Sequence, residues 1–288
     1  MSNPLIANLK LPGRTFQLPS KGLLYSADMF SEEVKNGEVH IHPLSSITEI
    51  SLKNPDLLLS GQAVLDVVRE CIPAIKRPLE LYSRDVDAIM FFLRIATYGD
   101  QYSIEVTHDC ENAKKHGYVA NVESIVNQMK MLDIETVKAN HEVLVGGQLV
   151  KTRPLLFRDL LGIFEMNIGK KEFSNEDLKN LAAQNLMSMI ESVDGITDRE
   201  QIREWAMLLP SRLVKKITDS AQLLNDWGPE QVVEIKCKDC GETMRVELPV
   251  NPINFFTDWF YQGIAIESKS LSTNSPLKQK WFWRMPMS

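Results

Sequence analysis

A Cys-x-x-Cys-Gly motif near the end of the chain is the sequence feature that most restricts its fold. Cys237 and Cys240 enclose two residues and precede Gly241, and the flanking runs 232–236 and 243–248 alternate apolar with polar residues. Such alternation predicts two β-strands, and the glycine accepts the tight turn that brings both sulfurs to one side. The pattern therefore predicts a metal-binding knuckle at the tip of a β-hairpin.

A knuckle supplies two thiolates, whereas a structural zinc requires four ligands. The best donor stretch elsewhere is 104–119, which carries Cys110 as the predicted third ligand. His116 is the preferred fourth ligand because it ends a lysine-rich loop that could fold back onto the ion. His108 is the alternative because strand alternation puts it on the same side as Cys110. The predicted structural zinc ligands are thus Cys110, Cys237, Cys240 and His116, with His108 as the alternative fourth ligand.

Two other interpretations of the Cys237–Cys240 pair stay open. A redox pair of the thioredoxin type belongs at a helix N-terminus, whereas these cysteines lie between strand-like runs. The pair could also be a relic knuckle that binds no metal. A catalytic zinc is not expected, because a closed set of ligands leaves no open coordination position and no nearby glutamate is placed as a general base.

The segments on either side of the knuckles predict an α+β fold, in which a mixed domain carries a zinc ribbon-like pair of β-knuckles and an inserted helical subdomain. The expected parts are an extended N-terminal arm (1–36), an α+β domain with the first knuckle (37–153), a helical subdomain (154–227), the second knuckle hairpin (228–250) and an aromatic C-terminal tail (251–288). The arm is rich in Pro and Gly turns. It is either a poorly ordered leader or a segment that docks apolar residues on a partner or on its own domain.

Periodicity and capping residues predict the elements within these parts. We expect a strand at 39–43, helices at 56–72 and 83–98, strands on both sides of the first knuckle, a short helix at 124–131, a hairpin at 142–150 and four helices between 154 and 227. Cys71 is expected to face a core and to be inert. His40 and His42 share one face of a strand, where no nearby cysteine or carboxylate pattern completes a metal site, so we expect a solvated face.

Composition narrows the class of protein. The chain is 44% hydrophobic and 24% charged with a net charge of −6, so it lacks the basic field of a general nucleic-acid binder. The sequence contains no uninterrupted run of 18 apolar residues, so no membrane span is predicted. Four cysteines in 288 residues are too few for a secreted disulfide scaffold. We find no phosphate-binding loop and no hydrolase motif, so neither enzymatic activity nor a small-molecule substrate is expected. The aromatic tail is expected to contact protein, either a partner or its own core.

Several short motifs resemble one known family, the baseplate proteins of T-even-type bacteriophages. They span roughly residues 15–125 and resume at the second knuckle. The motifs are Leu18-Pro19-Ser20-Lys21-Gly22 with Tyr25, Leu57, Gly61-Gln62-Ala63-Val64, Cys71-Ile72, Asp85, Asp87, residues 94–102 and Cys237-Lys238-Asp239-Cys240. Residues 154–227 and the tail carry little of the resemblance. The chain also departs from a full zinc ribbon, because Cys110 stands alone where a second cysteine pair is expected.

The resemblance implies a non-enzymatic structural or assembly protein of a contractile tail baseplate, in the hub region. Its partners would be other baseplate or tail subunits. It would assemble in the host cytoplasm and stay in the virion, or, as an alternative, act as a transient assembly chaperone absent from the virion. A zinc-ribbon nucleic-acid binder is a second alternative, against which the acidic balance of the chain speaks.

Overall fold

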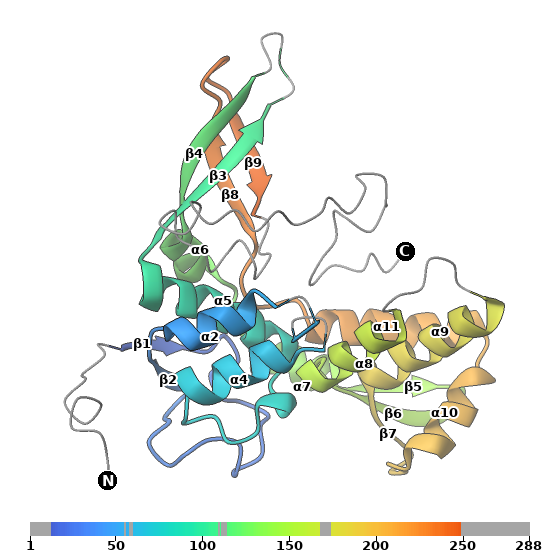
Figure 1. Ribbon diagram of the computed structural model, residues 1–288. Coiled ribbons are helices and arrows are strands. Elements are labelled where there is room, and N and C mark those ends of the chain that lie inside the picture. Colours follow the sequence, from blue (N-terminus) through green and yellow to red (C-terminus); the bar gives the residue numbers. More distant parts are fainter. Residues whose placement is uncertain are drawn as a thin grey trace.

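The structure is a computed structural model that describes residues 13–54, 56–57, 60–108, 110, 114–167 and 174–248, with the backbone alone for 164–167. The predicted aromatic tail at 251–288 and the first twelve residues of the predicted arm lie outside the described residues. The fold is α+β, as predicted, with small antiparallel sheets among helices. Figure 1 shows a helical body, a second unit beside it and two β-hairpins that project together from the body.

Helix α5 (Ser83–Tyr98) forms the centre of the body and is confirmed over its whole predicted length. Its Phe91 and Phe92 are fully buried. Helix α4 (Gln62–Cys71) packs in the same core, but the predicted helix at 56–72 is interrupted at Gly61, whose φ of 71° is left-handed. A further helix, α2 (Ser46–Leu52), begins at a Ser45 cap that the sequence reasoning missed.

The described part of the N-terminal arm lies on the body. Strand β1 (Arg14–Gln17) pairs antiparallel with β2 (Glu38–Ile41). Phe16 stacks on Phe92 with ring centroids 4.6 Å apart, and Leu18 is completely buried. Residues of this segment thus help to close the body core.

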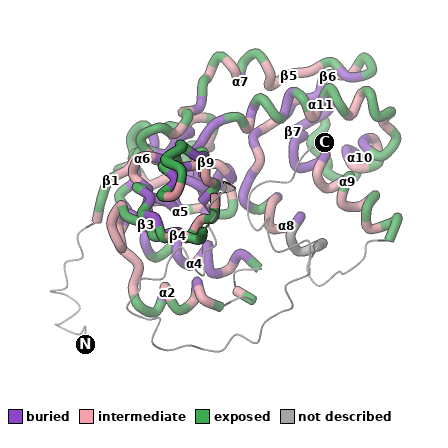
Figure 2. Tube along the Cα trace, turned by 90° about the horizontal axis from the view of Figure 1, so that it is seen from above, coloured by how far each residue is buried: buried purple, intermediate pink, exposed green. Residues whose placement is uncertain are grey.

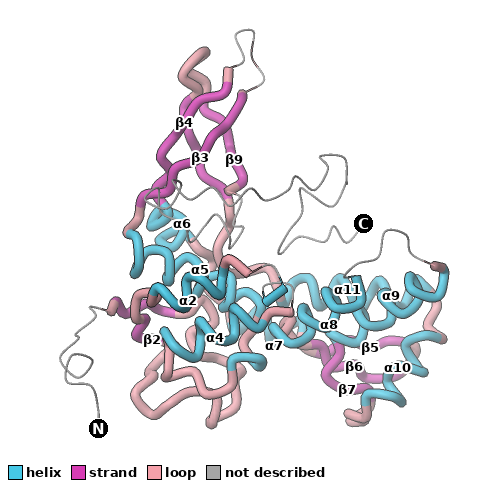
Figure 3. Tube along the Cα trace, viewed as in Figure 1, coloured by secondary structure: helices cyan, strands magenta, loops and turns pink. Residues whose placement is uncertain are grey.

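Figure 3 shows the second unit, in which strands lie beside helices. Its elements are β5 (Glu142–Val145), β6 (Gln148–Thr152), β7 (Ile190–Val193), α9 (Asn175–Met189), α10 (Arg199–Met207) and α11 (Ser211–Leu224). The sheet has the order β5-β6-β7, and its buried residues share a separate core with the helices. The predicted hairpin and the predicted capping box at Ser174 are confirmed, whereas β7 is a strand where helix was expected. The predicted boundary at residue 153 therefore passes through a unit with one core.

Four further elements are η1 (Pro78–Glu80), α6 (Val122–Gln128), α7 (Ile134–Asn140) and α8 (Phe157–Asn167). Helix α6 packs on α5 in the body, and α7 packs on α11 of the second unit. Helix α8 contacts both α5 and α9. A third apolar cluster, which includes Tyr82, Leu156 and Trp227, lies between the units. Figure 2 shows buried positions gathered around α4 and α5 and again around β7. Among the described helices, none has the length and apolar character needed to cross a membrane.

Candidate metal centre

Two β-hairpins carry the predicted knuckles at their tips. Strand β3 (Gln101–Thr107) pairs with β4 (Lys115–Asn121), and β8 (Val232–Lys236) pairs with β9 (Thr243–Glu247). The hairpins rise side by side from the body, and β4 contacts β8 (Figure 1). We call this pair the stalk. Each hairpin alternates buried with exposed residues, as their sequences predict.

The stalk has an apolar interior that continues the core of the body. Ile104 and Tyr118 come from the first hairpin, and Val233 and Met244 come from the second. Each of these side chains is 9% exposed or less. Burial of apolar surface between the hairpins holds them together, and their tips consequently meet.

Four side chains converge where the tips meet. One ligand atom each from His108, Cys110, Cys237 and Cys240 lies within 4.8 Å of all the others. The Cys240 Sγ is 3.3 Å from the His108 Nδ1. Two ligands of one tetrahedral zinc, a sulfur and an imidazole nitrogen, would lie roughly 3.5 Å apart. The cluster therefore has the composition and nearly the spacing of a closed zinc site.

The second knuckle is shaped by its own backbone. Gly241 has a φ of 77°, and its N–H donates to the Cys237 carbonyl over 3.0 Å. The Cys237 N–H donates to the carbonyl of Glu242 over 2.8 Å, which closes the turn from the other side. These bonds direct both sulfurs toward the first hairpin.

The same turn favours the thiolate form of Cys237. Its pKa is lowered to about 6, first by the main-chain N–H of Cys240 and also by that of Asp239, whose nitrogen is 3.4 Å from the sulfur. The side chain is buried, which opposes the shift without cancelling it. Zinc binds the thiolate, so a sulfur in this environment is suited to be a ligand.

His116, the preferred fourth ligand in the sequence, lies outside the four-residue cluster. Its Nε2 is 2.8 Å from the Asp239 Oδ2, and this contact lowers the pKa of Asp239. Beside it, the Lys238 N–H donates to the Tyr118 hydroxyl over 3.1 Å, and the Lys238 ammonium lies over the Tyr118 ring. These polar contacts give the two tips a second connection, which the spacing of cysteines and histidines could not reveal.

Comparison with known families agrees with the motifs. The family model described as T4 bacteriophage base plate protein matches residues 44–257, which is more than half of the chain. The chain belongs to this family. The match includes both hairpins of the stalk and residues 154–227, where the sequence motifs are sparse. Comparison with curated proteins and with solved structures gave no match.

The remaining candidate residues of this baseplate protein lie apart from the stalk cluster. Cys71 is 1% exposed within α4, and burial raises its pKa to about 12, as expected for an inert thiol. His40 and His42 are neighbours on β2, with ring centroids 5.0 Å apart. The His40 Nδ1 is 3.2 Å from the Thr15 hydroxyl. Among the described residues, neither histidine belongs to a metal-binding group.

Proposed function

We propose that this baseplate protein is a non-enzymatic component of the hub region of a contractile tail and acts through contacts with other tail subunits. The family match over residues 44–257 is the observation that carries this proposal. A structural role is also supported by the stalk, whose four converging ligands would fill the coordination sphere of a zinc ion. A closed sphere has no position for a substrate or a reactive water.

We further propose that His108, Cys110, Cys237 and Cys240 bind one structural zinc ion. The geometry favours His108 over His116 as the fourth ligand, because His108 is in the cluster and His116 pairs with Asp239. When bound, zinc would supply folding free energy by joining two hairpins that are more than a hundred residues apart in the chain. The tip of the stalk would then keep one shape for docking on a partner.

Elemental analysis of the purified protein tests the metal site. We expect about one zinc per chain, in line with a closed four-ligand site. His108→Ala should lose most of this zinc, whereas His116→Ala should keep it. Cys71→Ala is a matched control, because it removes a thiol that is buried outside the cluster. Wild-type protein without zinc would refute the site, and zinc loss from His116→Ala alone would restore His116 as the ligand.

Co-expression with the hub and wedge subunits of the same phage tests the baseplate role. We expect the protein to co-purify with at least one of them and to be retained in the tail baseplate after assembly in the host cytoplasm. Mass spectrometry of purified particles then separates the two possible roles. A component is present in stoichiometric amount, whereas a transient assembly chaperone is absent. Association with nucleic acid that weakens steeply with salt, without any subunit contact, would instead support the nucleic-acid alternative.

A further inference from the structure

The two residues between the knuckle cysteines both contact the other hairpin of the stalk. The Asp239 carboxylate is 2.8 Å from the His116 Nε2, and the main-chain N–H of Lys238 donates to the Tyr118 hydroxyl over 3.1 Å. The Lys238 ammonium donates to the Gly117 carbonyl and lies 5.0 Å from the centre of the Tyr118 ring. All of these partners belong to β4. We call the contacts of Asp239 and Lys238 with β4 the latch.

The latch and the metal ligands of the first hairpin lie on different strands. His108 and Cys110 follow the end of β3, whereas the latch partners lie on β4. On the paired strand, His116 is the Cα partner of Val106, two residues before His108. The latch therefore holds the Cys-x-x-Cys turn from beside the four-ligand cluster, and its residues are not members of that cluster.

Partial burial makes the latch a contact that forms without a metal ion. The side chains of His116 and Asp239 are 26% and 15% exposed. A carboxylate only accepts, so the His116 Nε2 carries the proton in this contact. Hydrogen bonds to an ionised acceptor are roughly twice as strong as neutral ones. Tyr118 is itself buried in the stalk interior, which fixes the position of its hydroxyl.

The knuckle turn requires such a contact, because its own hydrogen bonds are internal. The bonds of Gly241 and Cys237 orient both sulfurs relative to the second hairpin, but they do not determine how the turn faces the first hairpin. The latch supplies that orientation. Asp239 also connects it directly to a ligand, since its N–H lies 3.4 Å from the Cys237 Sγ.

We propose that Asp239 and His116 are positioning residues that assemble the four-ligand cluster before a metal ion binds. This proposal rests on the zinc site proposed above. When only a fraction of molecules has its ligands together, the apparent affinity for the ion is reduced by that fraction. The latch raises the fraction. Its loss should therefore weaken zinc binding although all four ligands are still present.

Zinc affinity, measured on the purified full chain by competition with a chelator, tests this role. Asp239→Ala and His116→Ala should each weaken zinc binding about tenfold, the effect of losing one charge-assisted contact. The double variant should be no weaker than the single ones, because both substitutions remove the same contact. Both single variants should still contain about one zinc per chain after purification, since structural zinc sites bind far too tightly for a tenfold loss to empty them.

Hydrogen exchange of the metal-free proteins gives a readout that does not depend on zinc. In wild-type protein stripped of metal, main-chain N–H groups of residues 237–241 should stay protected. In metal-free Asp239→Ala and His116→Ala, exchange there should be about tenfold faster, as expected for the loss of one charge-assisted contact. His116→Ala leaves the sequence of the turn unchanged, so an effect of this variant identifies the contact between the hairpins as the cause. Zinc should restore protection in all three proteins.

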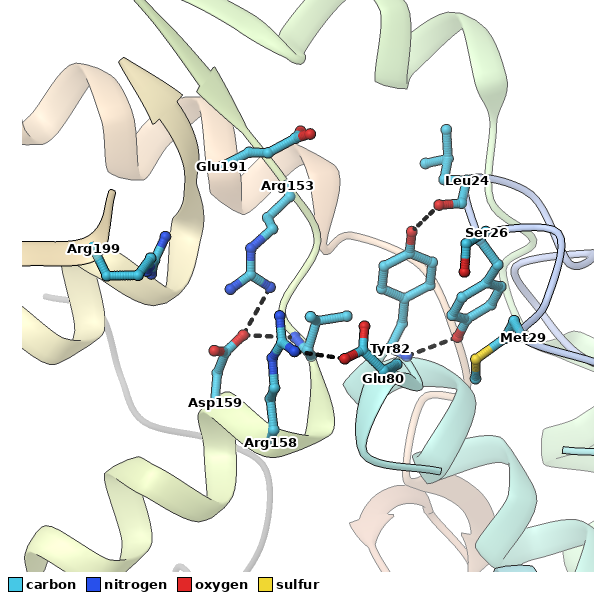
Figure 4. Close-up of a pocket in the computed structure, with 12 residues that line it drawn as sticks. Leu24, Ser26, Met29, Glu80, Tyr82, Arg153, Arg158, Asp159, Glu191 and Arg199 are labelled. Carbon is cyan, nitrogen blue, oxygen red and sulfur yellow. Dashed lines mark hydrogen bonds and ion pairs between the residues drawn. The ribbon is translucent and has the colours of Figure 1, made fainter. Parts of the chain in front are cut away.

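Two substitutions are matched controls. Glu242→Gln removes an exposed carboxylate from the same turn, so it measures the general attraction between negative charge and the ion. Glu80→Gln removes an ion pair elsewhere, since the Glu80 carboxylate is 2.6 Å from the Arg158 Nη1. Figure 4 shows this pair in a cavity whose lining residues all lie outside the stalk. Both controls should bind zinc with the affinity of the wild type.

Three results would overturn the proposal. They are equal exchange at 237–241 in metal-free wild type and Asp239→Ala, unchanged zinc affinity in both latch variants, and an equal loss of affinity in Glu242→Gln and Asp239→Ala. Failure of the zinc site itself is a separate outcome. If the wild type bound no zinc, the exchange of the metal-free proteins would still decide whether the latch holds the two tips together.

Discussion

Replacement of Asp87 by asparagine should make this protein more stable at neutral pH. Asp87 lies on α5 with its side chain 1% exposed, and one carboxylate oxygen is 3.3 Å from Arg84. The other oxygen is buried without a hydrogen-bond partner. Arg84 in turn donates to the Asn225 carbonyl over 3.1 Å at the end of α11, so the pair lies where the body meets the second unit.

The magnitude follows from the pKa of this carboxyl. Burial raises the pKa of Asp87 from 3.8 to about 7, although Arg84 opposes the shift. An acid whose pKa is higher in the folded than in the unfolded state loses stability as the pH rises. The stabilising contribution of the protonated Asp87 side chain is fully present below about pH 4 and is lost as the pH rises through about 7. Between these two pH values, unfolding releases one proton per chain. The free energy of unfolding therefore falls by about 1.4 kcal/mol per pH unit, and by about 4 kcal/mol in total.

Urea unfolding at pH 4.5 and pH 8, in buffers with the same zinc concentration, measures this effect. Asp87→Asn should match the wild type within about 1 kcal/mol at pH 4.5, where asparagine resembles the neutral acid, and should exceed it by up to about 4 kcal/mol at pH 8. The wild-type curve keeps a further slope from Asp85, whose pKa burial raises to about 6. Both proteins retain Asp85 and the metal ligands. Subtracting the wild-type free energy of unfolding from that of the variant at each pH therefore removes their contributions.

Asp133→Asn is the control with the opposite sign. Asp133 caps α7, and its hydrogen bonds with Thr136 lower its pKa, so its contribution is present at neutral pH and is lost on acidification. Asparagine is an equally good cap, so this variant should be close to the wild type at pH 8. Parallel stability curves for the wild type and Asp87→Asn would refute the argument.

Four further substitutions test packing, backbone conformation and a buried hydrogen bond. Phe92→Ala should lower the free energy of unfolding by about 3–5 kcal/mol, because a fully buried ring is lost, and urea unfolding would show a smaller change if the core collapsed around it. Gly37→Ala should cost more than Gly195→Ala: both have a left-handed φ, but a Cβ at Gly37 would lie 2.5 Å from facing backbone, whereas at Gly195 it would meet nothing within 4 Å. Thermal unfolding ranks that pair, and equal melting temperatures would contradict it. Tyr25→Phe removes a hydrogen bond to the buried Asp85 carboxylate and should cost about 1.5–3 kcal/mol in urea unfolding at pH 8, where the carboxylate is ionised; a loss below about 0.5 kcal/mol would contradict this role.

Residues close together in the chain were sufficient to predict much of the secondary structure. The Cys-x-x-Cys-Gly turn, the alternating strands beside it, the length of α5 and the capping box at Ser174 depend on neighbours within a few residues. Patterns of this kind can be read directly, because caps, turns and periodicity are local. The motifs were also specific enough to point to the baseplate family that the later match shows.

Other elements depend on partners that are distant in the chain. Strand β7 continues a helical apolar pattern and becomes a strand because it pairs with β6, some forty residues earlier. Gly61 divides a run that reads as one helix: its backbone is left-handed, and a Cβ there would lie 2.2 Å from the Leu161 Cδ2 of the distant helix α8. Tertiary pairing overrides local propensity at such positions.

The proposed metal site shows the same division. Its residue types are plain in the sequence, which named Cys110, Cys237 and Cys240 and left two histidines as candidates. Only the packing of the hairpins distinguishes these histidines, because it puts His108 beside Cys240 and gives His116 to Asp239. The sequence by itself determined which side chains could bind a metal, and the tertiary structure decided which of them meet, because ligands are selected by distance in space.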